Sequence, residues 1–187
     1  MTLVTPPTEY PVSLAEAKAQ FRETSADEDA TIARLISAAV AHLDAQGVLG
    51  RAMVTQTWSQ AFHAPWARVF TKIPASALVS ATYYDENNVS QSLTIGDYSI
   101  LKHTDWSFIC PNDGISWPTT YSRPDAITFV FTAGYGDPHD VPENIRHAIL
   151  LLVTHWFENR TEAGENMSSI PFGFADLIGE TKLSFYG

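Results

Sequence analysis

The stretch Pro142-Glu-Asn-Ile-Arg-His-Ala-Ile-Leu-Leu-Leu-Val-Thr-His-Trp-Phe-Glu-Asn-Arg160 decides the fold of this chain. Its apolar residues recur at intervals of three and four, which places them on one face of an α-helix. They are Ile145, Ala148, Ile149, Leu152, Val153, Trp156 and Phe157. Pro142 suits the first turn, where its missing N–H is not needed. The stretch therefore predicts a long helix at the centre of a hydrophobic core.

A second apolar stripe lies near the start of the chain and consists of Ile32, Leu35, Ile36, Ala39, Val40 and Leu43. The acidic residues 27–29 precede it, where the helix dipole favours negative charge, and Gly47 follows it as a stop. Ser25-Ala-Asp-Glu28 has the form of a capping box, and so does Ser13-Leu-Ala-Glu16. Two N-terminal helices are therefore predicted, one after each serine.

Between about Thr55 and Thr132 the chain becomes rich in Val, Thr, Tyr, Phe and Trp. Such residues favour strands. The predicted strands are 78–84, returning through a turn at 85–88 to 90–95, followed by 98–102, 106–110 and 126–132. The expected fold class is α+β: two N-terminal helices and a long C-terminal helix form a core, and a small antiparallel β subdomain is inserted at 55–132. We expect a single domain over 1–187 with an extended C-terminal tail.

The chain of 187 residues has 21 acidic and 11 basic residues, and therefore a net charge of −10. This balance argues against a protein that grips nucleic acid, although DNA could still slide past its surface. Cys110 is the only cysteine, so neither an intramolecular disulfide nor a cysteine-based metal site is possible. We expect Cys110 to be a small buried hydrophobe. No apolar run approaches the roughly 20 residues that cross a bilayer, so no membrane partner is expected.

The sequence offers little catalytic chemistry. His147 and His155 would lie about 12 Å apart along one helix, too far for one metal ion. Gly134-Tyr-Gly136 lacks the lysine of a phosphate-binding loop and fits a turn better. We therefore expect no enzyme, no metal and no cofactor. A small hydrolase with its site in the loop 133–139 is the rival interpretation. A pair of Asp137 and His139 in a deep pocket would favour it.

The end of the chain is polar over 162–169 and then apolar again. An exposed apolar segment is a liability unless it packs on something, so we interpret residues 168–187 as an anchoring tail. Its candidate partner-binding residues are Ile170, Pro171, Phe172, Phe174, Leu177, Ile178, Leu183, Phe185 and Tyr186. The tail could dock on a partner protein or on a neighbouring copy, or it could fold as a last helix onto its own core.

Several short motifs follow one another along the chain. They are Val12-Ser-Leu-Ala-Glu-Ala-Lys18, Asp27-Glu-Asp29, Gly50-Arg51, Thr55-Gln-Thr-Trp58, Tyr83-Tyr-Asp85, Ala133-Gly-Tyr-Gly136, Val141-Pro142, His155-Trp-Phe-Glu-Asn-Arg160 and Pro171-Phe-Gly173. In this order they resemble the phage head–tail connector (adaptor) family, in the longer subgroup of alphaproteobacterial prophages and gene transfer agents. The resemblance covers nearly the whole chain. It departs at Leu177-Ile178 and the segment after it, where relatives end in a Leu-Leu and basic pattern.

The resemblance implies a structural virion protein rather than an enzyme. Members form a twelvefold ring beneath the portal protein, extend the DNA channel, and give a stopper or tail-completion protein its docking surface. The implied partners are therefore the portal, the next neck protein and copies of the chain itself, with DNA only as passing cargo. The implied location is the virion neck, after assembly in the bacterial cytoplasm. A stopper or tail-completion protein of the same neck is the alternative. Acidic residues lining such a channel would repel the phosphates of DNA.

Overall fold

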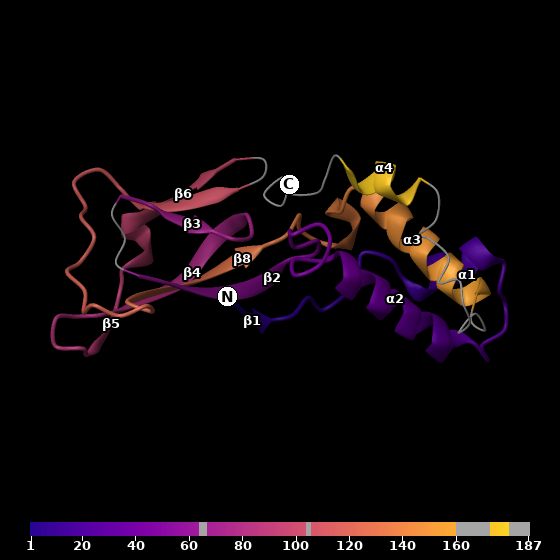
Figure 1. The fold of residues 1–187 in the computed structure, drawn as a ribbon. Helices are drawn as coiled ribbons and strands as arrows, with labels where there is room; N and C mark the ends of the chain where they lie inside the picture. Colours follow the sequence, from indigo (N-terminus) through magenta and orange to yellow (C-terminus); the bar gives the residue numbers. More distant parts are fainter. Residues whose placement is uncertain (64–66, 104–105, 160–172, 180–187) are drawn as a thin grey trace, which may run out of the picture. The chain divides into compact units, whose positions relative to one another are not determined.

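The computed structural model describes residues 1–63, 67–103, 106–159 and 173–179. It contains helices and antiparallel sheets, which confirms the α+β class. The chain divides into two compact units. We call Met1–Pro7 with Thr55–Gly134 the sheet unit, and Thr8–Val54 with Tyr135–Gly187 the helical unit. Figure 1 shows the elements of both units.

The strands are β1 (Thr2–Thr5), β2 (Gln56–Phe62), β3 (Val69–Thr71), β4 (Ala75–Tyr84), β5 (Ser90–Ser92), β6 (Tyr98–Lys102), β7 (Ser107–Pro111) and β8 (Ile127–Ala133). The helices are α1 (Leu14–Phe21), α2 (Asp29–Leu43), α3 (Glu143–Glu158) and α4 (Phe174–Gly179), with 3₁₀ turns η1 (Ile95–Asp97) and η2 (Pro138–Asp140). None of these helices is long and apolar enough to cross a membrane.

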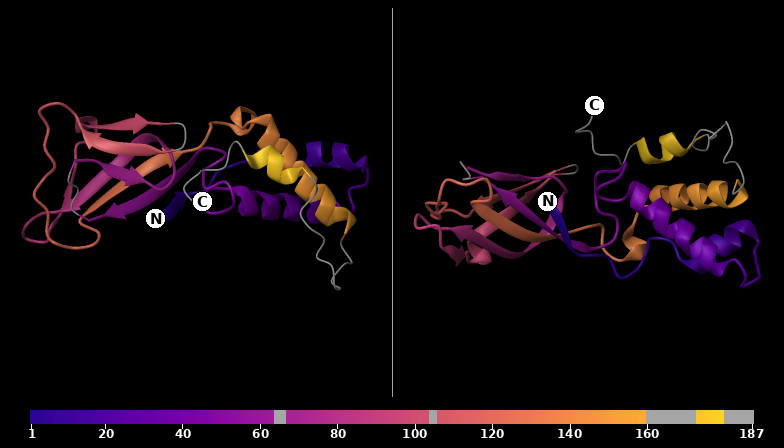
Figure 2. Two further views of the ribbon diagram at one scale, coloured as in Figure 1. Left: turned by 45° about the horizontal axis from the view of Figure 1, so that its top comes forward. Right: turned by 60° about the horizontal axis from the view of Figure 1, so that its bottom comes forward.

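The sheet unit is built around β8. A five-stranded sheet has the order β1-β2-β8-β4-β5, and a three-stranded sheet has the order β3-β7-β6. Figure 2 shows the ribbon from two further directions. Alternate residues of β8 point into the unit, and Ile127, Phe129 and Phe131 are fully buried. The Phe129 ring lies 6.0 Å from that of Tyr98 on the other sheet. The two sheets therefore pack against each other through their inner faces.

Two polar side chains buried between the sheets, Gln60 and Ser107, hydrogen-bond to neighbouring strands. The amide of Gln60 donates to the carbonyl of Phe70 at 3.3 Å and accepts from the backbone of Lys72 at 3.0 Å. The Ser107 hydroxyl lies 2.6 Å from the Thr71 hydroxyl and accepts from the Ala75 backbone N–H at 2.8 Å. Because a buried donor without a partner is costly, these bonds set how the two sheets pair.

The helical unit buries one core between α1, α2, α3 and α4. Its fully or nearly fully buried members include Ala17, Ile32, Ile36, Leu43, Ile145, Ile149, Leu152, Val153, Phe174 and Ile178. The rings of Phe21 and Phe157 stack at 4.8 Å, and Trp156 meets His42 edge-on. The stripes of α2 and α3 thus face each other, as their periodicity predicts.

Arg146 on α3 ties the ends of the helical unit together. Its guanidinium pairs with Glu16 of α1 and donates to the carbonyl of Pro11 at 3.0 Å. Burial alone would raise the pKa of Glu16. The hydrogen bonds from the backbone and hydroxyl of Ser13, together with the charge of Arg146, outweigh burial and hold that pKa below its ordinary value.

Several local predictions need correction. The Ser13–Glu16 capping box is present, but Ser25 does not cap α2. The Ser25 hydroxyl bonds instead to Asp27, and α2 begins at Asp29, whose carboxylate pairs with Lys18. The strand expected over 90–95 ends at Ser92 and gives way to η1. Cys110 is half-buried rather than buried. The strands β1, β2 and β3 were not anticipated. β1 and β3 are too short for an alternating pattern, and β2 turns Gln56 and Gln60 inward, so it lacks an apolar alternation.

The Ser107→Ala variant should lower the free energy of unfolding by about 1–3 kcal/mol, because the Ala75 N–H and the Thr71 hydroxyl then lose a buried partner. Denaturant unfolding followed by fluorescence measures this change. The exposed Ser92→Ala is the matched control, with an expected change within about 0.5 kcal/mol. Equal effects of the two variants would contradict the role of Ser107.

Candidate functional site

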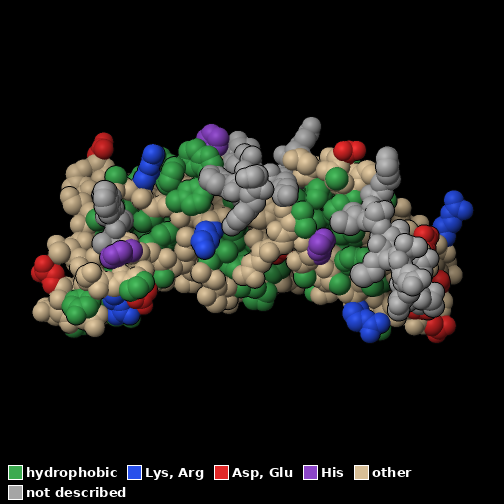
Figure 3. Space-filling model, viewed as in Figure 1, with side chains coloured by type: hydrophobic (Ala, Val, Ile, Leu, Met, Phe, Trp, Pro, Cys, Tyr) green, Lys and Arg blue, Asp and Glu red, His purple; other side chains and the backbone are tan. Residues whose placement is uncertain are grey.

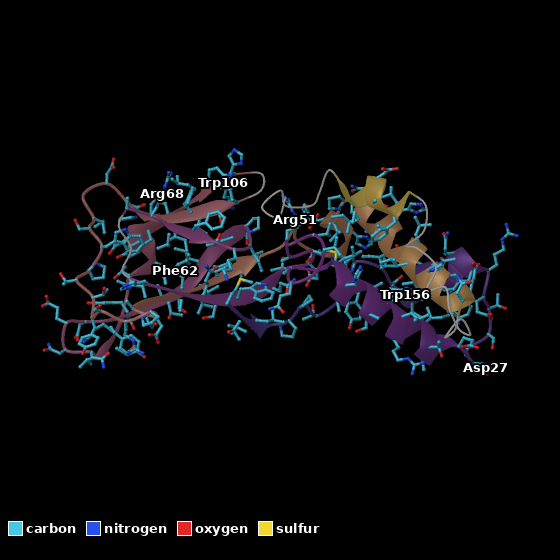
Figure 4. The ribbon with its side chains drawn as sticks, viewed as in Figure 1. Asp27, Arg51, Phe62, Arg68, Trp106 and Trp156 are labelled. Carbon is cyan, nitrogen blue, oxygen red and sulfur yellow. The ribbon has the colours of Figure 1, made fainter. Side chains whose placement is uncertain are left out.

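The loop before α3 brings together motifs that are far apart in the sequence. The backbone N–H of Tyr135 donates to the carbonyl of Met53 at 2.8 Å. The Arg51 guanidinium, labelled in Figure 4, donates to the Tyr135 hydroxyl at 3.3 Å. Gly136 forms a parallel bridge with Val54. The Gly50-Arg51 and Gly-Tyr-Gly motifs therefore act together to hold the start of α3 in the helical unit.

The same loop does not have the form expected of a hydrolase site. The side chains of Asp137 and His139 are both exposed. The Asp140 carboxylate accepts the backbone N–H of Asp137 at 2.9 Å and closes a capping box around η2. A deep pocket holding the pair would have favoured the hydrolase interpretation. The conformation of the loop is instead fixed by hydrogen bonds of its backbone, to Met53 and to Asp140.

Metal and ligand chemistry find little support among the described residues. No group of three or more His, Cys, Asp or Glu side chains lies close enough to hold a metal ion within the described ranges. An apolar groove of about 290 Å³ lies on the helical unit beside Tyr10, Leu14 and Ile36. Glu9 is its one charged lining residue, so the groove suits contact with another surface rather than bond-making chemistry.

The candidate tail residues are only partly described. Phe174 and Ile178, on α4, are 2% and 5% exposed and lie in the core of the helical unit, and Leu177 packs against that core. The Asn144 side chain donates to the carbonyl of Leu177 at 2.8 Å, which fixes α4 on α3. Ile170, Pro171, Phe172, Leu183, Phe185 and Tyr186 lie outside the described residues. A role of the tail in binding a partner stays a prediction.

The outer face of the three-stranded sheet carries a cluster of aromatic and basic side chains. Phe70, Phe108 and Leu101 form one cross-strand row. The Arg68 guanidinium lies 4.2 Å from the centre of the Phe108 ring, and Trp106 meets that ring edge-on. Figure 4 labels Arg68 and Trp106, and Figure 3 shows hydrophobic side chains gathered over β3 and β6. We call this surface, which also includes Ser99, His103 and Cys110, the aromatic face.

The outer face of the five-stranded sheet is different in kind. Its cross-strand rows consist of Thr5, Thr57, Thr132 and Ala77; of Thr2, Ser59, Val130 and Ser80; and of Ala61, Thr128, Thr82 and Ser92. All are uncharged, and none is buried. We call this surface the uncharged face. Exposed sheet faces usually carry charged residues, so an uncharged one is typical of a surface that another protein covers.

Sequence reasoning missed both faces. Phe70, Leu101 and Phe108 come from three strands, and only the strand register places them in one row. One signal was available: Phe108 and Cys110 are apolar at the outward positions of a strand whose inward residue is Ile109. Neither face contains an acid among the described residues, although the chain carries 21. Their composition fits protein contact.

The family match of this chain lies in its carboxyl-terminal part. That part contains β8, the Gly-Tyr-Gly loop, α3 and α4. Residues 114–182 match the family "Phage gp6-like head-tail connector protein". The resemblance inferred from the ordered motifs is thereby confirmed. A comparison with curated proteins finds no match.

Solved structures share the fold of this chain over almost its whole length. One is a chain of "Virion of native gene transfer agent (GTA) particle", with a TM-score of 0.75 and 21% identity, covering 97% of this chain and 94% of that chain. Two others, each 20% identical and covering 97% of this chain and 95% of theirs, are "Neck of empty GTA particle computed with C6 symmetry" and "Neck of native GTA particle computed with C12 symmetry". Their TM-scores are 0.73 and 0.71. At this identity the likeness shows a shared fold.

Gly136→Ala should destabilise the protein by about 1–3 kcal/mol, because Gly136 has a φ of +142° and an added Cβ would lie 2.3 Å from the Asp140 carboxylate. Thermal unfolding measures the loss. Gly96→Ala is the matched control, since nothing lies within 4 Å of the position of its Cβ. A Gly136 variant as stable as the Gly96 variant would show that the loop tolerates a side chain.

Proposed function

We propose that this chain is a structural neck protein of a tailed phage or phage-like particle, a head–tail connector that forms a ring with copies of itself. The observation that carries the proposal is the agreement of two comparisons. The family match covers 114–182, and the fold agrees with chains of gene transfer agent particles over 97% of the chain. Both point to the same part of a virion.

The surfaces of the chain support this role. A ring subunit needs lateral contact surfaces and needs no active site. The chain has two sheet faces that are uncharged or weakly basic, and an apolar groove. At the loop 133–139, the Asp140 carboxylate is hydrogen-bonded to the backbone of Asp137. The chain therefore acts by binding other proteins rather than by catalysis.

The finer assignments belong to the same proposal. The ring contains twelve copies, binds the portal protein on one side, and presents its other side to a stopper or tail-completion protein. DNA passes through it without being held, as the net charge of −10 favours. The helical core carries the β-rich insertion of 55–132, and residues 168–187 anchor the chain after assembly in the bacterial cytoplasm.

Electron microscopy of particles that carry a tagged copy of the chain tests the function. The expected result is a ring of tagged density at the neck, directly beneath the portal. Density next to the tail tube, separated from the portal by another ring, would assign the chain to the stopper or tail-completion role. Absence of the chain from purified particles would contradict a structural role altogether.

The anchoring tail has its own test. Leu183→Asp combined with Phe185→Asp should lower the amount of chain per particle by more than about tenfold, since each buried Leu or Phe side chain contributes about 1.5–3 kcal/mol to an interface. Quantitative mass spectrometry of purified particles measures the amount. Ser184→Ala is the matched control in the same segment and should have no effect. Normal incorporation of the double variant, with an unchanged melting temperature, would rule out anchoring by this end of the tail.

A further inference from the structure

We propose that neighbouring copies of this chain contact each other through their sheet units, with the aromatic face of one copy against the uncharged face of the next. The inference rests on the proposed ring and names the surfaces that build it. The partner of the aromatic face is thus a second copy of this chain.

Charge is the first reason for choosing a second copy. Each copy has a net charge of −10, so two copies repel each other unless the surfaces that meet lack acids. The strands β3, β6 and β7 contain no Asp or Glu, and the rows of the uncharged face contain no charged residue at all. Arg68 on the aromatic face adds positive charge, which attracts an acidic copy.

The placement of the two faces is the second reason. The sheets pack through Phe129 and Tyr98, so their outer faces point away from each other on opposite sides of one unit. A closed ring needs a heterologous contact, in which one surface of each copy meets a different surface of the next. Two unlike faces on opposite sides of the same unit meet this requirement, whereas a single self-complementary face would give only dimers.

The exposed side chains of the two faces are chemically suited to each other. On the aromatic face, Leu101 is 50% exposed and Phe70 and Phe108 are half-buried. The uncharged face offers Thr methyl groups, Ala and Val, against which these apolar side chains pack, and its Thr and Ser hydroxyls can accept hydrogen bonds from Arg68. A nucleic acid fits less well, because Arg68 already covers Phe108 and His103 stacks on Trp106 at 4.2 Å. Those ring faces are not open for base stacking.

The size of the faces predicts the strength of the contact. The uncharged face measures about 20 Å on each side and the aromatic face about 17 by 10 Å, from the usual rise and spacing of strands. The aromatic face limits the shared area to about 170 Å², well below the roughly 800 Å² per partner of a stable pair. The contact should be weak between two isolated copies and strong only when a ring closes, so the test belongs in assembled particles.

The only native cysteine allows a direct test, because Cys110 lies on the aromatic face opposite Ser99. Ser59→Cys places a second thiol on the uncharged face. Particles carrying this full-length variant are treated with a short bis-maleimide and analysed by denaturing gel. We expect a ladder of linked chains longer than dimers. The native chain and the S59C/C110S double variant, each with one cysteine, should remain monomeric.

Three other outcomes would overturn the inference, and each would point to a different cause. Dimers of the native chain would show that aromatic faces meet each other. Particles that contain the S59C chain but give no ladder would show that the sheet units do not meet through these faces, while the proposed neck function would stand. Absence of the chain from particles would instead refute the proposed function, and the inference with it.

A pair of charge variants at the exposed Ser80 supplies a second readout. On a chain this acidic, an added Glu would ordinarily weaken association more than an added Lys. If the uncharged face meets Arg68, the added Lys should instead weaken association more than the added Glu, because it repels Arg68. Ser80→Lys should then lower the linked fraction of the S59C chain by about two- to fivefold relative to Ser80→Glu, the factor of one exposed charge pair. A lower linked fraction for Ser80→Glu than for Ser80→Lys, with equal melting temperatures of the two variants, would contradict the contact.

Discussion

The pairing of β8 on both of its edges is the constraint on which the sheet unit depends. β8 forms ladders with β2 and β4 along its length, and its inward residues are fully buried. The chain then passes through Gly136 and η2 into α3, which supplies the centre of the helical core. One continuous run of chain thus provides the middle of both units. That run lies within the segment 114–182 that matches the connector family.

Surfaces suited to protein contact are the main functional feature of the described part of the chain. In the proposed ring, the net charge of −10 favours contact through surfaces that lack acids. The acid-free outer faces of the two sheets are such surfaces, and the apolar groove beside Tyr10 has one charged lining residue. In the proposed ring, the contact residues form rows of Thr, Ser, Phe and Leu drawn from several strands. Residues brought together in this way leave no short motif in the sequence.

The predictable parts of the fold were those with strong local periodicity. The stripes of α2 and α3 and the strands at 98–102 and 126–132 follow from spacing alone, because a buried face must repeat with the period of its element. The capping box at Ser25 failed because Asp27 offered its hydroxyl a nearer partner. β3 was missed because three residues are too few for a pattern. Of the candidate tail, Phe174 and Ile178 proved to lie in the helical core.

By itself, the sequence determined the α+β class, the acidic balance, the main helices and, through its ordered motifs, the connector resemblance. These depend on residue identity and on spacing within one element. Only the tertiary structure decided which residues share a face. Phe70, Leu101 and Phe108 are separated in the sequence and meet through the register of three strands. That register is set by which face of each strand is buried and by the geometry of the connecting turns, so no single strand encodes it.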